Sequence, residues 1–334
     1  MKLEENKVYL GDWVEGSKAI PDKSVNLLIA DPPYFEVKGE FDFVWKSFDD
    51  YLKDVECWAK ECKRLLADNG TLFWYGSAKR IAYAQIIFDK HFKLINSLVW
   101  ENTNPHKQQG RYSEGLRSFA PLTERILMYS NEVDQTGLEQ IKLDVNNFKP
   151  LRDYFQGLHS FVAVSKRVLI DVIGQRVDHC FRYNSTQWDL PTIETYNQLI
   201  ETFKINQWNG FKEYETLRKE YETLRKEYET LRRPFDNFMN FGDVIKMPNF
   251  ETGSYAHDTV KPEKLTRALI LTCSRKDDLV FVPFAGSGTE CAMAAKEKRR
   301  FIGFDIEDKY CQMANNRAKK YLENRQTSIL DFVD

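Results

Sequence analysis

The stretch Leu279–Thr289 reads Leu-Val-Phe-Val-Pro-Phe-Ala-Gly-Ser-Gly-Thr. Its first four residues are apolar and predict a buried strand over 279–282, and a helical run follows the glycines. Glycines between a strand and a helix let the backbone pass close to a ligand and present amide groups at the helix start. The next predicted strand, 301–304, delivers Asp305 at its carboxyl end, where a carboxylate can accept the hydroxyls of a ribose. This unit therefore predicts half of a nucleoside-binding site.

The same alternation of strand and helix occurs near the amino terminus. Val25–Ala30 is short and apolar and predicts a buried strand, and Thr71–Tyr75 predicts another. Between them, 48–67 has apolar residues at helical spacing and ends in Asp-Asn-Gly. Strands that alternate with helices predict an α/β fold with a doubly wound, mostly parallel sheet, of the Rossmann-like kind.

The alternation divides the chain into three parts. Residues 131–252 lose it and predict short helices joined by polar turns. The simplest architecture is one α/β domain formed by residues 1–130 and 253–334, interrupted by a helical insert at 131–252.

Composition limits the possible partners. The 334 residues contain 48 Lys and Arg against 50 Asp and Glu, which excludes a nucleic-acid partner bound by bulk charge but not one bound in a local basic groove. The six cysteines are scattered, so we expect free thiols and no metal site. No apolar run approaches the ~20 residues of a membrane span, and residues 1–20 are polar, so we expect a cytoplasmic protein without membrane contact.

A second candidate for ligand binding is Asp31-Pro32-Pro33-Tyr34, directly after the first buried strand. The two prolines fix the backbone, and the carboxyl ends of strands are where open α/β sheets bind ligands. The Asp31 carboxylate and the Pro32 carbonyl can accept two N–H groups of an exocyclic amine, while the Tyr34 ring can stack on a planar base. The alternative interpretation is a plain proline turn.

Several motifs, taken together and in this order, resemble those of a known family. They are Tyr9-Leu10-Gly11-Asp12, Ile20-Pro21-Asp22-Lys23-Ser24-Val25, Asp31-Pro32-Pro33-Tyr34, Asn69-Gly70-Thr71-Leu72-Phe73, His257-Asp258-Thr259-Val260-Lys261-Pro262, Pro283-Phe284-Ala285-Gly286-Ser287-Gly288-Thr289 and Gly303-Phe304-Asp305. The chain resembles the β class of DNA amino-methyltransferases, which use S-adenosylmethionine. The resemblance covers roughly residues 5–130 and 253–320.

The resemblance implies roles for individual residues. Asp31, Pro32, Pro33 and Tyr34 correspond to the catalytic turn that holds a flipped base. Cofactor contacts are implied for Asp12, Asp31, His257, Thr259, Lys261, Phe284, Gly286, Ser287, Gly288, Thr289 and Asp305. The chain departs from the family pattern at Val282, where a carboxylate near the cofactor's amino group is usual, and at Asp258, where proline is usual.

The implied reaction is direct transfer of a methyl group to N6 of adenine in double-stranded DNA. Hydrogen bonds at Asp31 and Pro32 would stabilise the positive charge that develops on the amine, and base flipping would bring that amine to the site. No cysteine follows a proline, so the nucleophile of C5-cytosine methylation is absent. Two alternatives are methylation of N4 of cytosine, against which Asp rather than Ser at position 31 argues, and a non-catalytic DNA-binding protein, which Val282 favours.

The insert contains the candidate DNA-reading residues. Predicted helices at 151–158 and 165–173, a turn at Gly174 and a third piece at 177–183 together suggest a helix–turn–helix. Basic residues mixed with amides suit contacts to phosphates and base edges. The candidates are Lys166, Arg167, Arg176, Arg182 and Gln187. The alternative is a helical bundle with ordinary surface charge.

A heptad repeat occupies residues 213–233, where Glu-Tyr-Glu-Thr-Leu-Arg-Lys recurs. Tyrosine and leucine alternate at spacings of three and four, which predicts a helix with one apolar stripe. Two interpretations remain: a coiled-coil contact in a homodimer, or a helix packed on its own domain. A cognate restriction enzyme is a further possible partner that the sequence does not decide.

Overall fold

The computed structural model describes residues 3–35, 44–104, 115–131, 148–185, 187–249 and 260–330. The chain divides into two compact units, one formed by Met1–Gln135 with Arg233–Asp334 and the other by Thr136–Arg232. The predicted boundary at residue 252 is wrong, because strand β6 (Val244–Met247) pairs with β4 (Lys93–Asn102) in the sheet of the first unit.

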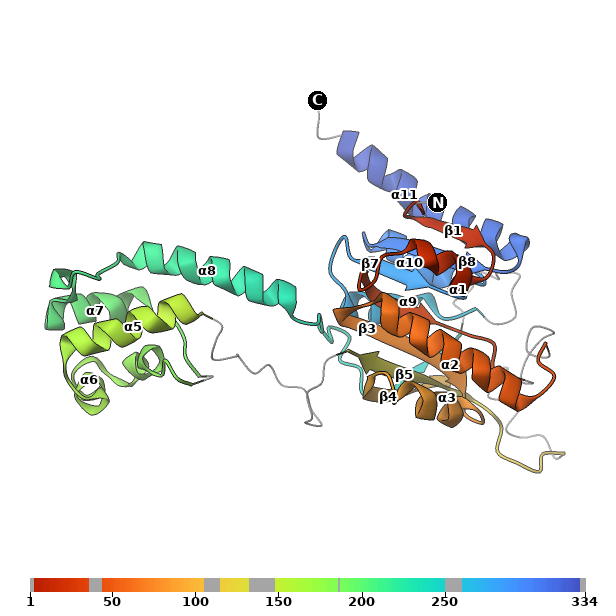
Figure 1. The fold of residues 1–334 in the computed structure, drawn as a ribbon, viewed down its shortest axis with the longest axis horizontal. Coiled ribbons are helices and arrows are strands. Elements are labelled where there is room, and N and C mark those ends of the chain that lie inside the picture. The colour runs from red at the N-terminus through yellow and green to blue at the C-terminus, as the bar shows by residue number, and fades with distance from the viewer. Residues whose placement is uncertain are drawn as a thin grey trace. The chain divides into compact units, whose positions relative to one another are not determined.

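The first unit contains an eight-stranded sheet within the described residues, in the order β1-β8-β7-β2-β3-β5-β4-β6 (Figure 1). Its other strands are β1 (Lys7–Leu10), β2 (Val25–Ala30), β3 (Leu66–Ser77), β5 (Thr123–Ser130), β7 (Leu279–Val282) and β8 (Arg300–Asp305). Strands β1, β8, β7, β2 and β3 are parallel to one another, whereas β5 is antiparallel to both β3 and β4, and β6 is parallel to β4. The predicted doubly wound, mostly parallel sheet is confirmed.

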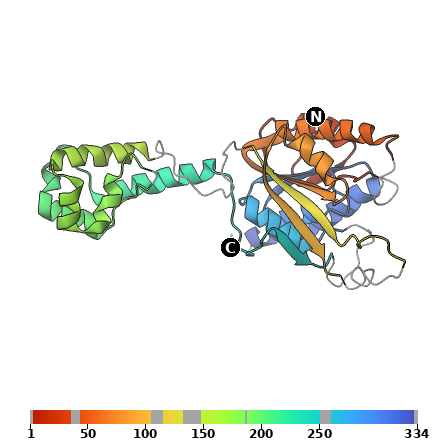
Figure 2. The same cartoon turned by 90° about the horizontal axis from the view of Figure 1, so that it is seen from below.

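Two sets of helices cover the sheet, one on each face. The first set consists of α1 (Trp13–Gly16), η1 (Ser17–Ala19), α2 (Phe48–Leu65) and α3 (Ile81–Phe88). The second set consists of α9 (Glu263–Cys273), α10 (Thr289–Lys296) and α11 (Asp308–Leu330). Figure 2 shows the orange helices of the first set and the blue helices of the second on opposite sides. Because side chains alternate along a strand, Leu27 and Ile29 of β2 pack with the second set, and Leu28 and Ala30 with the first. A strand buried on both faces needs a nearly continuous apolar run, which 25–30 provides apart from Asn26, whose Oδ1 accepts from the Leu279 amide.

The sheet has a switch point between β7 and β2. These strands are parallel neighbours, with Leu28 opposite Phe281, so the chain leaves both at the same edge of the sheet. From β7 the chain continues through α10 toward β8, and from β2 it continues through α2 toward β3, on the other side. Connections that diverge in this way open a crevice at the carboxyl ends of the strands, where α/β proteins bind ligands.

The second unit is helical where it is described. Its elements are α5 (Lys149–Val162), α6 (Lys166–Ile173), η4 (Gln175–Phe181), α7 (Ile193–Phe203), η5 (Ile205–Gln207) and α8 (Tyr214–Leu231). Its core includes the fully buried rings of Phe155, Phe181 and Tyr196. The third piece of the predicted helix–turn–helix, η4, is a 3-10 helix rather than an α-helix, because Gly174 ends α6 with φ +105° and the chain then tightens. The helix–turn–helix prediction is therefore wrong at its recognition helix.

Helix α8 carries the heptad stripe. Leu217 is fully buried, and Tyr221 and Leu224 pack against the core of the same unit. Glu220, at an edge of the stripe, binds Lys212 at 2.8 Å. The structure therefore supports the interpretation of a helix packed on its own domain. Among the described helices, none is both long enough and apolar enough to cross a membrane.

Candidate active site

The glycine loop between β7 and α10 has a backbone that only glycine adopts easily. Gly286 and Gly288 have φ of +48° and +76°. A Cβ added to Gly288 would lie 2.4 Å from the Cα and Cβ atoms of Ala314 in α11. The loop is fixed to the neighbouring strand, since the Ala285 amide donates to the Phe304 carbonyl at 2.8 Å. Backbone amides at the start of α10 are therefore held in place by close packing.

We expect Gly288→Ala to destabilise the protein by about 2–4 kcal/mol, because it adds left-handed backbone strain to an overpacked contact. Urea unfolding of the purified variant measures this. Gly242→Ala is the matched control, since an added Cβ there meets nothing within 4 Å. Equal unfolding midpoints for the two variants would contradict the close approach of α10 and α11.

Asp305 ends β8 and binds the glycine loop from the side. Its Oδ2 accepts from the Gly286 amide at 2.8 Å, and its Oδ1 accepts from the Glu307 amide at 2.9 Å. Each carboxylate oxygen has two lone pairs, so each can accept a further hydrogen bond from a hydroxyl group. Leu10 and Ile306 are 58% and 70% exposed beside it, at the ends of β1 and β8, and offer apolar surface to a planar ring. Asp305 thus joins the loop to a surface suited to a nucleoside.

Ser287 and Thr289, predicted to contact the cofactor, are buried and held from α11. The Nη1 atom of Arg317 donates to the Ser287 carbonyl at 2.8 Å, to Ser287 Oγ at 3.2 Å and to Thr289 Oγ1 at 3.0 Å. The Nη2 atom of Arg317 donates to Glu263 at 2.8 Å. Phe284 is half-buried, and its ring lies 5.1 Å from that of Trp58 and 5.9 Å from that of Trp13. These contacts shape the loop, and cofactor contact by these residues stays a prediction.

Asp12 follows β1 and caps helix α1. Its Oδ1 accepts from the Glu15 amide at 3.0 Å, and the preceding Gly11 amide donates to the Asp305 carbonyl at 2.8 Å. These contacts bring Asp12 to the same edge as Asp305, as the resemblance implied, although one of its oxygens serves the helix.

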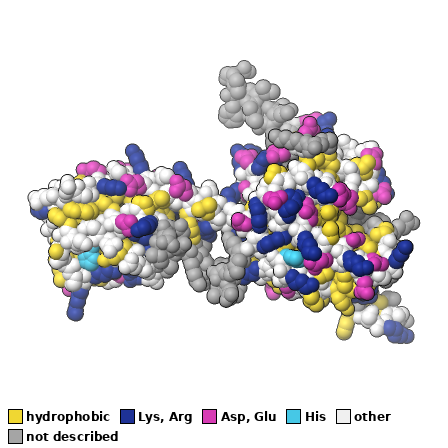
Figure 3. All heavy atoms as spheres, in the orientation of Figure 1, with side chains coloured by type: hydrophobic (Ala, Val, Ile, Leu, Met, Phe, Trp, Pro, Cys, Tyr) yellow, Lys and Arg dark blue, Asp and Glu magenta, His cyan; other side chains and the backbone are white. Residues whose placement is uncertain are grey.

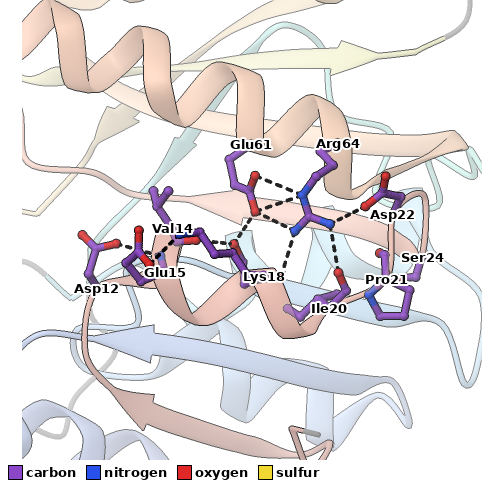
Figure 4. A network of polar contacts seen from close by, with 11 residues as sticks. Asp12, Val14, Glu15, Lys18, Ile20, Pro21, Asp22, Ser24, Glu61 and Arg64 are labelled. Carbon is purple, nitrogen blue, oxygen red and sulfur yellow. Dashed lines mark hydrogen bonds and ion pairs between the residues drawn. The ribbon is translucent and has the colours of Figure 1, made fainter. Parts of the chain in front are cut away.

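Figure 4 shows how the segment after Asp12 is fixed to helix α2. The Arg64 guanidinium donates to the carbonyls of Ser17 and Ile20 at 2.8 Å and 3.0 Å, and pairs with Glu61 at 2.6 Å. Glu61 in turn accepts from the Ser17 hydroxyl. The loop that carries Asp12 is therefore rigid at both ends.

The Asp-Pro-Pro-Tyr turn follows β2, next to the glycine loop across the switch point. The Tyr34 hydroxyl donates to Asp31 Oδ1, and the Tyr51 hydroxyl donates to the Pro33 carbonyl at 3.1 Å. The Tyr34 side chain is only 5% exposed. The ring is buried and its hydroxyl binds Asp31, and stacking of this ring on a base stays a prediction. Tyr34 orients the carboxylate.

A buried lysine completes the turn. Lys261 Nζ lies 2.7 Å from Asp31 Oδ2 and 3.0 Å from Glu124 Oε2. It also donates to the Tyr34 hydroxyl at 3.3 Å. The Lys261 side chain is 4% exposed, against 22% for Asp31 and 18% for Glu124. We call Asp31, Glu124 and Lys261 the charged triad.

Two pKa shifts follow from this geometry. Burial by itself lowers the pKa of Lys261, but attraction to Asp31 and Glu124 outweighs it and raises that pKa above the ordinary value. Burial, followed by repulsion from Asp31 and Glu124, raises the pKa of Tyr34. Lys261 is therefore a permanent cation and Tyr34 a permanent hydroxyl donor around Asp31.

Lys261 was predicted on the cofactor side, and the structure places it against the catalytic turn. Glu124, the second residue of β5, was missed, because one acidic residue near the beginning of a strand is an ordinary sequence pattern. Arg317 lies in a polar helix and was missed for the same reason. Glu290 was also missed, although its place directly after the glycine motif was a local indication of a site residue. His257, Asp258 and Thr259 lie outside the described residues, and Val282 is a fully buried residue of β7.

The predicted DNA-reading residues occupy two different settings in the second unit. Arg182 pairs with Asp178 and also contacts Gln187, so its charge is partly neutralised. Arg167 and Arg176 are exposed on α6 and η4. On the face seen in Figure 3, acidic and basic side chains are interspersed. DNA contact by these residues, and by Lys166 beside them, stays a prediction.

The fold defines an α/β protein with a two-part candidate ligand site at the switch point of its sheet. The chain belongs to the DNA methylase family, whose profile matches residues 25–316. It is 27% identical over 337 residues to the type II methyltransferase M.HinfI of Haemophilus influenzae, with 96% of this chain and 70% of that protein covered. It is also 27% identical over 327 residues to the DNA adenine methyltransferase YhdJ of Escherichia coli K12, with 94% and 83% covered. The predicted family is confirmed.

Two solved structures share the fold. The PvuII DNA methyltransferase, described as cytosine-N4-specific, superposes with a TM-score of 0.55 at 15% identity, and 97% of this chain and 93% of that chain are covered. A putative DNA modification methylase from Thermus thermophilus superposes with a TM-score of 0.50 at 19% identity, with 95% of each chain covered.

Proposed function

We propose that this protein is a site-specific DNA methyltransferase that uses S-adenosylmethionine to methylate N6 of adenine in double-stranded DNA. The observation that carries the proposal is the placement of Asp31, oriented by Lys261 and Tyr34, beside the glycine loop at the switch point. The name of one relative, a DNA adenine methyltransferase, supports the choice of base.

The residues present fit S-adenosylmethionine. The glycine loop, with positive φ at Gly286 and Gly288, leads into the start of α10, where backbone amides can bind a ligand, and Asp305 can accept hydrogen bonds from ribose hydroxyls. Glu290, one residue into α10, has a buried carboxyl oxygen without a hydrogen-bond partner among the described residues. The cofactor, when bound, supplies an electrophilic methyl group.

The chain's own residues act on the acceptor amine. An exocyclic amine on adenine is a poor nucleophile because its lone pair is delocalised. Asp31 and the Pro32 carbonyl accept its N–H bonds and so stabilise the positive charge that develops on nitrogen. Lys261 and Tyr34 fix the Asp31 carboxylate beforehand, so little reorganisation is needed. Asp31 can also take the proton that the amine releases.

The experiment that tests this function expresses the protein in a host that lacks DNA methylation and sequences the modified bases of the host DNA. N6-methyladenine in one sequence context supports the proposal. N4-methylcytosine would establish the alternative base. Unmodified DNA, together with no binding of S-adenosylmethionine by the purified protein, would overturn the proposal, and DNA binding by that protein would then support the non-catalytic alternative.

For the second unit we expect Arg167→Ala/Arg176→Ala to weaken DNA binding and to reduce the salt dependence of the binding constant. If each arginine contacts one phosphate, the slope of log K against log salt falls by about 0.9 per residue. Fluorescence anisotropy at several salt concentrations measures this. The control is Lys226→Ala, an exposed base on α8. A double variant with the slope of the parent protein would show that this face does not contact DNA.

A homodimer and a cognate restriction enzyme remain part of the hypothesis. Leu231 of α8 is 72% exposed at the end of the heptad stripe and is the residue through which a second copy would pair. Light scattering at micromolar concentrations distinguishes a dimer from a monomer.

A further inference from the structure

Glu290 is a buried carboxyl group that the proposed chemistry does not use. It is the second residue of α10, directly after the glycine loop, and only 5% of it is exposed. Its Oε1 atom is buried and has no hydrogen-bond partner among the described residues. A buried polar atom without a partner costs free energy, so its retention calls for a reason.

Charged and titratable groups from four other elements face Glu290. They are Asp31 after β2, Lys261 before α9, Arg317 on α11 and Tyr75 on β3. The Tyr75 hydroxyl is also buried without a partner among the described residues, and its ring centroid lies 5.0 Å from Lys261 Nζ. Glu290 therefore lies within electrostatic range of Asp31, at the start of the helix that follows the glycine loop.

The cations in this region already have carboxylate partners. Lys261 binds both Asp31 and Glu124, and Arg317 binds Glu263 at 2.8 Å. An ionised Glu290 would be an additional negative charge without a cation of its own. Burial, with repulsion from Asp31, accordingly raises the pKa of Glu290 from 4.5 to about 7. A positively charged ligand beside this carboxyl group would supply the missing charge.

The proposed function brings such a ligand to this place. S-adenosylmethionine is a sulfonium cation, and direct transfer requires its sulfur to approach the amine that Asp31 holds. We propose that Glu290 is a cofactor-binding residue whose carboxylate pairs with the sulfonium charge, and that it loses its proton as S-adenosylmethionine binds. The inference rests on the proposed function. It also distinguishes the charged cofactor from the product S-adenosylhomocysteine, whose sulfur is neutral.

The test measures the dissociation constants of S-adenosylmethionine and S-adenosylhomocysteine by titration calorimetry from pH 5.5 to 8.5. A group of pKa about 7 that ionises on binding makes the affinity for S-adenosylmethionine rise about tenfold from pH 6 to pH 8. We expect no such rise for S-adenosylhomocysteine. In Glu290→Gln we expect the rise to disappear and the affinity for S-adenosylmethionine at pH 8 to fall at least about tenfold, the size of a lost charge-assisted contact.

Glu297→Gln is the matched control, because Glu297 lies just after the far end of the same helix and pairs with the surface residue Arg267. We expect this variant to bind like the parent protein. If Glu290→Gln kept the parent pH profile, or if both ligands showed the same rise in the parent protein, the inference would be overturned. A parent protein that binds neither ligand would instead overturn the proposed function.

A stability measurement separates binding from a structural role. Because the pKa of Glu290 is raised in the folded protein, the parent loses stability as the pH rises from 4.5 to about 7. Glu290→Gln lacks this loss, so at pH 8 it should be at least as stable as the parent. A marked drop in its unfolding midpoint at pH 8 would show a structural role and contradict the inference.

Discussion

We expect Asp31→Asn to lower the rate of methyl transfer by about 100-fold to 1000-fold, the loss typical when one preorganised group that stabilises developing charge is removed. Asparagine keeps the shape of the side chain but not its negative charge. The variant should fold, since Lys261 keeps Glu124 at 3.0 Å as a partner and the charged triad becomes neutral. Single-turnover transfer of labelled methyl groups to DNA measures the rate.

The control for this variant is Asp68→Asn, which removes a carboxylate that is 89% exposed and pairs with Lys23 on the surface of the same unit. It should transfer methyl groups at the parent rate. DNA binding and the unfolding midpoint of Asp31→Asn should also match those of the parent. A transfer rate within tenfold of the parent would exclude Asp31 from the chemistry.

We expect Lys261→Met to destabilise the protein by about 2–4 kcal/mol. Removing one partner of a fully buried ion pair costs about 3–5 kcal/mol because the other charge is left unpaired. We expect somewhat less here, since Asp31 and Glu124 are 22% and 18% exposed and water screens them partly. Urea unfolding at pH 7 measures the loss.

The neutral variant Asp31→Asn/Glu124→Gln/Lys261→Met is the control. It removes all three charges together and should regain most of the lost stability. The stabilisation by Lys261 also has a defined pH range. Because its pKa is raised in the folded protein, the contribution is complete below the ordinary lysine pKa of about 10.4 and is lost only as the pH rises toward the higher value. If Lys261→Met were as stable as the parent protein, the charged triad would contribute nothing to the free energy of unfolding.

Several strands and helices of the first unit were predictable from the sequence. The apolar run 25–30 and the run 279–282 are strands with the predicted bounds, and Asp305 ends a strand as expected. The helix predicted at 48–67 is α2, which ends two residues earlier. These features depend on hydrophobic period and turn chemistry, which act between residues close in the chain.

Other features were missed because they depend on long-range pairing. Strand β6 is only four residues long and follows an aromatic, asparagine-rich stretch of the predicted insert, and only its pairing with β4 makes it part of the sheet. The 3-10 geometry of η4 follows from the backbone conformation of Gly174. The sequence predicted a turn at this glycine but not the backbone angles with which the chain leaves it. The Tyr34 ring was predicted to stack on a base, whereas its burial and its contacts with Asp31 and Lys261 depend on residues far apart in the chain.

The sequence by itself determined that this protein has a glycine loop after one strand, a rigid acidic turn after another, and the family to which both belong. Only the tertiary structure decided that Lys261, 227 residues from Tyr34, neutralises Asp31, and that Arg317 holds the loop. It also decided that one carboxyl oxygen of Glu290, Oε1, is buried without a hydrogen-bond partner among the described residues. The physical reason is that periodicity and turns are set by neighbours in the chain, whereas the charge balance of a site is set by the order of strands in the sheet.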